Sequence, residues 1–489
     1  MSDRQPNIVI FNPDQYRGDV LGHMGDPAAQ TPNLDRFAAE EAVSFRNAFC
    51  QLPVCTPSRC SFMSGWYPHV RGHRSQLYMM RKDEPVLLKT LKENGYFVWW
   101  GGKNDLVPAQ YGYEDSCHVK VRPEGEVRRM HASDRQADWR GPKDGSDYYS
   151  FFVGRLDKGS APYYRDSDWA YVEAALRFIR TWDDERPFCL YLPLTFPHPP
   201  YGVEDPWFSA IDRSRIPPRR PEPEGSKASI LQEMIRRHGL REKGEAWWNE
   251  LRAVYYGMCA RVDHQFGLIV DALKEAGRYD DTALFFFSDH GDFAGDYGLV
   301  NKQYNVMDDN LTRVPFLVKP PAGVPVQPGI SEALVELVDF PATVFDLSGI
   351  EPDWRHFGKS LLPVVAGDKK AHRDAVFCEG GRLYGEKMWD QFHLEKHGRE
   401  SLYWPAIGSI AAEEPSCTKA VMCRNREFKY VHRLYESDEL YDLRSDPEEA
   451  VNRIDDPALA DILAAMKDRT MRFYLETADV MPPDLDRRS

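Results

Sequence analysis

The chain lacks several features that mark whole classes of protein. None of its 489 residues belong to a stretch of eighteen consecutive apolar residues, so we expect no transmembrane helix and no membrane partner. The opening MSDRQPNIVIF has no basic start followed by an apolar run, which argues against a secretory signal. Internal repeats and low-complexity tracts are also missing, which excludes solenoid and fibrous architectures.

An excess of positive charge is absent as well. Lys and Arg number 62 against 76 Asp and Glu, and the formal net charge is -14. A general nucleic-acid binder depends on clustered Lys and Arg, so no nucleic-acid partner is expected. An anionic substrate would have to be attracted by local positive charge.

Cysteine is scarce and irregularly spaced. The nine cysteines are an odd number without a disulfide framework, which is typical of reduced thiols and predicts a cytoplasmic protein. Nothing in the sequence indicates the oligomeric state.

Short apolar strands alternate with amphipathic helices along most of the chain. This order predicts an α/β fold with a large mixed, mostly parallel sheet sandwiched by helices. Thr31 is expected to cap a helix that begins at Pro32. The expected strands are 7–11, 96–100, 188–194 and 282–287, and the expected helices are 87–94, 169–182, 247–276 and 337–347.

Closely spaced strand candidates follow near the end of the chain, at 420–423, 428–431 and 439–443, before a helix at 458–475. They predict a smaller C-terminal domain of antiparallel sheet plus helix. We place a catalytic domain at 1–370 and a C-terminal α+β subdomain at 371–489. The polar segments 114–162 and 201–244 are long for plain connections and are interpreted as lids or surface insertions.

Two oxygen-rich pairs come directly after strands. Asp14-Gln15 follows the first strand, and Asp289-His290 follows the strand 282–287. Ligands of such sheets gather beyond the carboxyl ends of the strands, so the two pairs could meet at one edge. Each pair alone would more often be a turn or cap.

Cys55 lies in LPVCTPSRCSFMSGWYPH, where Cys-x-Pro-Ser-Arg is followed by the apolar start of a helix. A lone Cys before a Thr-Pro turn is usually a small buried residue with an unreactive thiol. The longer pattern, however, resembles the signature of the type I sulfatases of the alkaline phosphatase superfamily. The segments around both oxygen-rich pairs and the run Glu439 to Leu443 resemble that family too, so the likeness covers nearly the whole chain.

The resemblance implies that a formylglycine-generating enzyme converts Cys55 to formylglycine, whose hydrate has two hydroxyls. One hydroxyl attacks the sulfur of a sulfate ester, and the other then expels the sulfate, which splits one hard step into two. It also implies that Asp14, Gln15, Cys55, Asp289 and His290 bind one divalent cation. Oxygen ligands favour Ca²⁺, with Mg²⁺ or Mn²⁺ as alternatives.

Further residues match family positions that handle charge and protons. Lys103 and His198 follow strands, and Lys302 follows the Asp-His loop. By resemblance they hold the sulfate oxygens and protonate the leaving oxygen, which stabilises developing charge. Arg59 is expected to orient the nucleophile, since its guanidinium has several fixed donors.

One position departs from the family pattern. Sulfatases commonly continue Gly-Lys-x-His, whereas this chain has Gly102-Lys103-Asn104-Asp105. Asp105 could accept the proton in the second step, or His73 or His69 could do so.

The resemblance therefore predicts hydrolysis of a sulfate monoester, with a small-molecule or saccharide sulfate ester as substrate. A phosphonate monoester or phosphodiester hydrolase with the same site is the closest alternative. Such relatives resemble this chain in having Asp-Gln at the first metal pair. Against them, Ser58 completes the stricter Cys-x-Pro-Ser-Arg form of the sulfatase signature. A two-metal phosphatase would need ligands that the sequence does not supply. A protein whose Cys55 is never oxidised would be catalytically silent.

Overall fold

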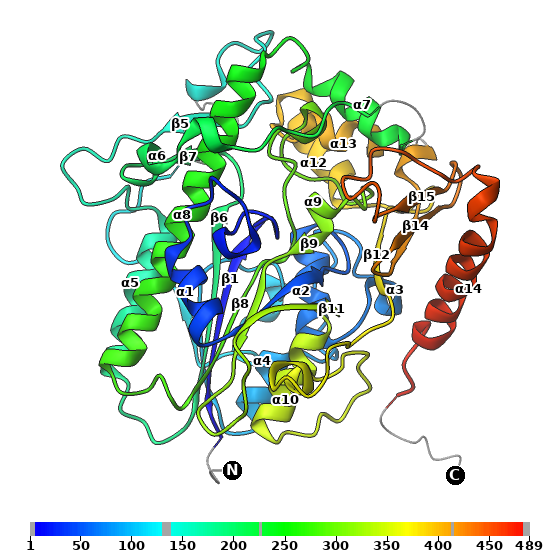
Figure 1. Ribbon diagram of the computed structural model, residues 1–489. Helices are drawn as coiled ribbons and strands as arrows, with labels where there is room; N and C mark the ends of the chain where they lie inside the picture. Colours follow the sequence, from blue (N-terminus) through cyan, green and yellow to red (C-terminus); the bar gives the residue numbers. More distant parts are fainter. Residues whose placement is uncertain (1–4, 130–137, 224–226, 412–414, 483–489) are drawn as a thin grey trace.

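A mixed sheet forms the centre of the computed structural model, which describes residues 5–129, 138–223, 227–411 and 415–482 (Figure 1). Within these ranges nine strands belong to it, in the order β11-β2-β10-β8-β1-β6-β3-β4, with β9 paired to β2. Five of the strand pairings are parallel and three are antiparallel. The bounds are β1 Asn7–Asp14, β2 Val43–Phe49, β3 Phe97–Gly101, β4 Val119–Val121, β6 Phe188–Pro197, β8 Thr282–Phe287, β9 Arg313–Val314, β10 Phe316–Lys319 and β11 Gly329–Glu336.

Strand β1 lies in the middle of the sheet and is buried on both faces. Its side chains alternate between two apolar clusters: Ile8 and Ile10 pack on one side, and Val9 and Phe11 on the other. Alternation with a period of two is what a strand imposes, and a strand apolar at every position must be covered twice.

Helices cover both faces of the sheet (Figure 1). One layer consists of α1 (Pro32–Glu40), α5 (Ser167–Thr181) and α8 (Glu245–Glu275), and the opposite layer of α2 (Cys55–Ser64), α4 (Leu87–Glu93) and α10 (Asp339–Ser348). The short helices are α3 (Pro68–Arg71), α6 (Trp207–Ala210), α9 (Asp309–Thr312) and α11 (Leu362–Val365). The predicted α/β sandwich is confirmed.

The helix at Pro32 begins where expected, but Thr31 does not cap it with its side chain. The Thr31 hydroxyl instead accepts a hydrogen bond from the Gly22 amide and donates one to Asp35. The turn before the helix competes for this hydroxyl, which explains the difference.

The two long insertions meet above the carboxyl ends of the central strands. Strand β5 (Phe152–Arg155) comes from the first insertion and pairs in parallel with β7 (Tyr201–Val203) of the second. Helix α7 (Ser229–His238) packs on α13 (Trp404–Ala411), which in turn packs on α12 (Trp389–His397). These helices lie together at the top of Figure 1, on the side of the sheet where strand β6 ends.

A second sheet follows the last central elements. In the part of the chain that is described, its antiparallel strands are β12 (Val376–Gly380), β13 (Ala420–Arg424), β14 (Phe428–Arg433) and β15 (Glu439–Asp442). Helix α14 (Ala460–Thr477) covers it by packing Met466 and Phe473 against Phe377 and Tyr430. The predicted small sheet with a helix is confirmed, and the boundary at residue 370 stays a prediction.

Helix α8 is the longest helix, with 31 residues, and it carries charged side chains along its length. Among the described residues, no helix has the length and apolar character needed to cross a bilayer.

Candidate active site

Four neighbouring parallel strands deliver the candidate residues to one edge of the sheet. Strands β8, β1, β6 and β3 lie side by side in that order. Asp14 ends β1, Asp289 and His290 follow β8, Lys103 follows β3, and His198 follows β6. Because parallel strands end at the same edge, residues far apart in sequence converge there.

A buried cluster of metal-ligating groups lies at this edge. The ligand atoms of Asp14, Cys55, Asp289 and His290 lie within 4.8 Å of one another. The Cys55 sulfur is 3.5 Å from Asp14 Oδ1 and 3.3 Å from His290 Nε2. Two carboxylates and an imidazole suit a divalent cation, so this group fits a metal site.

His290 has the protonation state that metal binding requires. Burial lowers the pKa of its imidazole to about 4, so the ring is neutral near pH 7. Its Nδ1 lies 2.9 Å from the Gly291 carbonyl oxygen, which can only accept a hydrogen bond. Nδ1 therefore carries the proton, and the lone pair of Nε2 faces the cluster.

Arg59 is completely buried beneath the cluster. One guanidinium nitrogen, Nη2, lies 2.9 Å from Asp14 Oδ2 and 2.9 Å from Asp289 Oδ2. The other, Nη1, donates to Asn12 Oδ1 at 2.8 Å and to the Tyr191 hydroxyl at 3.1 Å. The planar guanidinium thus holds the two carboxylates at a set separation, and helix α2 fixes Arg59 one turn after Cys55.

Lys103 reaches the cluster from the end of β3. Its ammonium donates to Asp14 Oδ2 at 2.6 Å and lies 3.4 Å from the Cys55 sulfur. Asp105, which replaces the histidine of the family pattern, pairs with the same ammonium at 2.9 Å. Lys103 therefore links Asp105 to Cys55.

Lys302 lies on the opposite side and donates to the Gln15 side-chain oxygen at 2.7 Å. The Gln15 side-chain nitrogen donates to Asp292 Oδ2 and to Asn301 Oδ1. Gln15 adopts a left-handed backbone conformation, with φ 69°, which a non-glycine residue adopts only when its surroundings enforce it. Its role as a metal ligand stays a prediction.

His198 is 7% exposed and follows β6. Its Nδ1 lies 2.6 Å from the Pro199 carbonyl oxygen, so this nitrogen carries a proton. Nε2 is the other ring nitrogen that could exchange a proton with a bound group.

Four side chains of the predicted site shift the pKa of Asp14. Burial by itself would raise the pKa of its carboxyl, but Lys103, His198, Arg59 and Lys302 together hold that pKa well below its usual range. Asp14 is therefore an anion held among nearby cations.

The thiol of Cys55 is a poor nucleophile as it stands. Burial, and then the charge of Asp14, raise its pKa to about 12. A thiol in this state is almost entirely protonated near pH 7, whereas the thiolate is the reactive form.

His73 and His69, the alternatives to Asp105 as the base of the second step, have other partners. His73 lies 2.9 Å from Glu84 through Nε2 and 2.8 Å from the Tyr78 carbonyl oxygen through Nδ1. His69 lies 2.8 Å from Glu379 and 2.9 Å from the Thr477 carbonyl oxygen. Both ring nitrogens of each histidine are occupied, so Asp105 is the better candidate.

A model of the sulfatase family matches residues 6–350. The chain belongs to the sulfatase family. The matched segment contains every candidate residue from Asp14 to Lys302, and it ends just after α10.

Relatives of this sulfatase-family chain cover almost its full length. The multifunctional alkaline phosphatase superfamily protein PehA of Trinickia caryophylli is 26% identical, with 97% of this chain and 96% of that protein aligned. The choline-sulfatase of Rhizobium meliloti is 25% identical, with 94% and 84% aligned. The crystal structure of the phosphonate monoester hydrolase of Agrobacterium radiobacter superposes with a TM-score of 0.75 at 22% identity, covering 97% of this chain and 96% of that one.

Several residues of the sulfatase site escaped the sequence analysis. Asn12 and Tyr191 position Arg59, and Asp292 and Asn301 position Gln15. Asn12 and Asp292 stand within two or three residues of predicted ligands, so their spacing was a usable signal. Tyr191 lies in the middle of an apolar strand, and no local pattern distinguishes it from a core residue.

Proposed function

We propose that this sulfatase-family protein hydrolyses a sulfate monoester, with formylglycine derived from Cys55 as nucleophile beside one divalent cation. The observation that carries the proposal is the position of the Cys55 sulfur, which lies within 3.5 Å of Asp14, His290 and Lys103. A thiol with a pKa of about 12 has little use at such a site, whereas a hydroxyl pair formed from the same residue does.

Asp14, Asp289, His290 and the modified Cys55 would hold the cation, with Gln15 as a fifth candidate. Modification replaces the sulfur ligand with oxygen, which makes the donor set harder and suits Ca²⁺, Mg²⁺ or Mn²⁺; Ca²⁺ is the ion that we expect. When bound, the cation supplies Lewis acidity to a sulfate oxygen and lowers the pKa of the attacking hydroxyl.

The protein's own cations would hold the sulfate and its developing charge. Lys103 and Lys302 approach the cluster from opposite sides, through Asp14 and Gln15 respectively. Fixed donors of this kind stabilise a transition state without reorganisation. Arg59 orients the two carboxylates and does not exchange protons, because a guanidinium paired with two carboxylates stays charged.

Two groups would move protons. His198 is a candidate to protonate the leaving oxygen through Nε2, since Nδ1 is engaged with the Pro199 carbonyl. Asp105 would accept the proton in the second step, by way of the Lys103 ammonium that it contacts. The ammonium would transfer one proton to Asp105 and receive one from the hydroxyl.

The maturation partner in this scheme is a formylglycine-generating enzyme, and a cytoplasmic location remains our prediction from the nine reduced cysteines. All nine lie in the described part of the chain, where each is buried and none forms a disulfide. The substrate would be a small-molecule or saccharide sulfate ester.

Mass spectrometry of the Cys55 peptide tests the nucleophile. Protein produced with a competent maturation enzyme should contain the aldehyde or its hydrate at Cys55, and a thiol that is alkylated throughout would contradict the mechanism. Released sulfate should be measured on aryl and sugar sulfates, with Cys55→Ala as the inactive control.

Phosphonate monoester hydrolysis is the second candidate. The pair Asp14-Gln15 resembles the phosphonate hydrolases, and the relative PehA is named multifunctional. Sulfate monoesters and phosphonate monoesters each carry a single negative charge, so the cations of this site do not separate them by charge. Assaying phosphonate monoesters beside the aryl and sugar sulfates distinguishes the two functions, because the ester class that the enzyme prefers should have the larger kcat/KM.

A further inference from the structure

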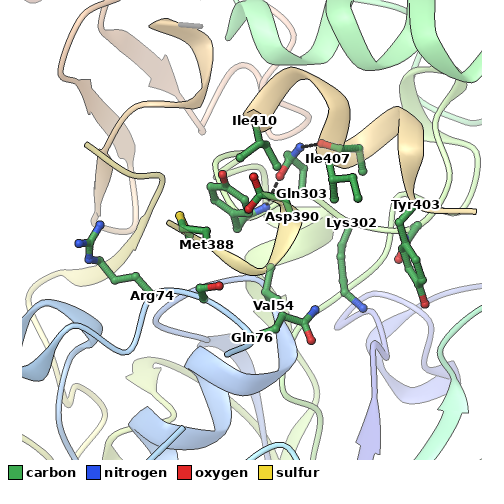
Figure 2. Close-up of a pocket in the computed structure, with 14 residues that line it drawn as sticks. Val54, Arg74, Gln76, Lys302, Gln303, Met388, Asp390, Tyr403, Ile407 and Ile410 are labelled. Atoms are coloured by element: carbon green, nitrogen blue, oxygen red, sulfur yellow. Dashed lines mark hydrogen bonds between the residues drawn. The ribbon is translucent and has the colours of Figure 1, made fainter. Parts of the chain in front are cut away.

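A small pocket opens beside Lys302 of the candidate site, between the end of the central sheet and helices α12 and α13 (Figure 2). We call it the side pocket; its lining includes Val54, Gln76, Lys302, Tyr304, Asp390 and Ile407, and its volume is ≈ 50 Å³. Val54 immediately precedes Cys55, and the Gln76 carbonyl accepts a hydrogen bond from the Thr56 hydroxyl. Lys302 lines this space and also donates to Gln15 in the candidate site, so the part of an ester that leaves the sulfur would enter it.

The side pocket has two different ends. Figure 2 shows the Lys302 ammonium and the Gln76 amide at the end near α2, while Asp390 lies toward the opposite end, under Ile410 and Ile407. Between these ends the lining is mostly apolar. An ester bound here would direct its charged group to Lys302 and its alcohol chain toward Asp390.

Two polar atoms at the far end lack a partner. Asp390 is 2% exposed and Tyr304 is 9% exposed. Neither Asp390 Oδ2 nor the Tyr304 hydroxyl has a hydrogen-bond partner among the described residues. Burial, and then the charge of Asp390, raise the pKa of Tyr304, which indicates that the two side chains are close neighbours.

A buried carboxylate oxygen without a donor is unfavourable, and native proteins rarely retain one without a reason. Burial raises the pKa of Asp390 to about 6, which still leaves most of it ionised near pH 7. Arg382 is the cation that acts on Asp390, and its guanidinium donates to the Glu386 and Ile410 carbonyls. A ligand that brings a hydrogen-bond donor would satisfy the free oxygen.

The size of the side pocket restricts the ligand further. One water-sized group needs roughly 10–15 Å³ of such volume, so ≈ 50 Å³ holds a short chain and not a hexose with its hydroxyl groups.

We propose that the side pocket selects the alcohol part of the ester, and that Asp390 with Tyr304 recognises an ammonium group at the end of a short alkyl chain. This assignment rests on the proposed function, because it places the reacting group at Cys55. Asp390 and Tyr304 would be specificity-determining residues for a sulfated amino alcohol.

The test compares ω-aminoalkyl sulfates with n-alkyl sulfates of the same chain length, using metal-loaded, formylglycine-containing protein. A charge-assisted hydrogen bond in a buried site should make kcat/KM about 10- to 100-fold higher for the amino ester. Asp390→Asn should remove this preference while kcat/KM for the alkyl ester changes little, and Tyr304→Phe should reduce it. Asp374→Asn is the control: this side chain is 69% exposed, lies just before β12 and pairs with Arg469 of α14, far from the side pocket's lining.

The outcomes are distinct. If amino and alkyl esters react equally well, or if Asp390→Asn keeps the preference, the recognition of an ammonium group is refuted. Asp390 also lies in the first turn of α12, so a purely structural role would lower the melting temperature of Asp390→Asn without changing the preference. Preference for a sugar sulfate would refute the restriction to a slender chain.

A binding measurement separates this proposal from the proposed function. Free amino alcohols, the products of the reaction, should bind the wild-type protein in saturation-transfer NMR, and binding should be lost in Asp390→Asn. If no ester releases sulfate, the proposed function fails, and the side pocket is then judged by this binding alone. Absence of binding to the wild type would overturn the assignment.

Discussion

Replacing Arg59 with Gln would test how the two central carboxylates are held together. Asp14 and Asp289 both contact the same guanidinium nitrogen at 2.9 Å, and all three side chains are fully buried. Without Arg59 and without metal, Asp14 would keep Lys103 but Asp289 would lose its guanidinium partner, and two carboxylates would share one buried site with a single lysine, which is strongly unfavourable. We therefore expect one of the two carboxyls to take up a proton in the folded variant.

The loss of stability in Arg59→Gln can be calculated from the cost of protonating that carboxyl. Protonating a carboxyl of normal pKa, about 3.9, at pH 7 costs about 4 kcal/mol. This agrees with the 3–5 kcal/mol that generally accompanies the loss of one partner from a buried pair. Because the folded variant binds a proton that the unfolded chain does not, its deficit should shrink by about 1.4 kcal/mol for each unit that the pH falls toward 4.

Urea unfolding of metal-free protein at several pH values measures this free energy. A divalent cation should restore part of the loss in Arg59→Gln, because it supplies positive charge to the same carboxylates. Arg261→Gln is the matched control: Arg261 is buried against Asp166 and Glu204, so it should also be destabilising, but no metal should rescue it. If Arg59→Gln matched the wild type in chelator, or lost the same stability at every pH, the electrostatic account would be wrong.

Three further results are expected. Removing metal with a chelator should abolish sulfate release. It should also lower the free energy of unfolding by about 2.7 kcal/mol relative to protein at a metal concentration of 100 times Kd. In the same urea titration, Asp289→Asn should not be stabilised by metal. Phe286→Ala should cost about 3–5 kcal/mol in urea unfolding, since its ring is fully buried and packs against Phe11, Tyr16 and Phe266; a cost below about 1 kcal/mol would contradict this packing. His238 is buried, and burial lowers the pKa of its imidazole to about 4. Its contribution to stability is therefore fully present above pH 6.5 and decreases by about 3 kcal/mol as the pH falls to 4. His238→Gln should flatten the dependence of the unfolding free energy on pH over this range, and an unchanged dependence would refute the assignment.

The sequence by itself determined the class of fold and the family. Strands such as Ile8 to Phe11 are apolar at every position, and their alternation with amphipathic helices allows few arrangements other than a covered, mainly parallel sheet. Motifs at Cys55, Asp14-Gln15 and Asp289-His290 follow local elements, so their place at the strand ends could be predicted without coordinates.

Only the tertiary structure decided which side chains contact one another in the site. The sequence left the base of the second step open between Asp105, His73 and His69, and the fold pairs each histidine with other groups. Nothing in the local pattern of Asp390 distinguishes it from a residue at the start of an exposed helix, yet the fold buries it in a pocket that Lys302 also lines.

The physical reason is the range of the interactions. Hydrophobic periodicity and turn chemistry act between residues close in sequence, so a single chain read in order reveals them. Protonation, ion pairing and burial depend on groups brought together from distant segments, as when Lys302 meets Gln15 or when Arg59 joins Asp14 to Asp289. Only the folded chain sets these distances, and they determine which of the predicted residues can act together.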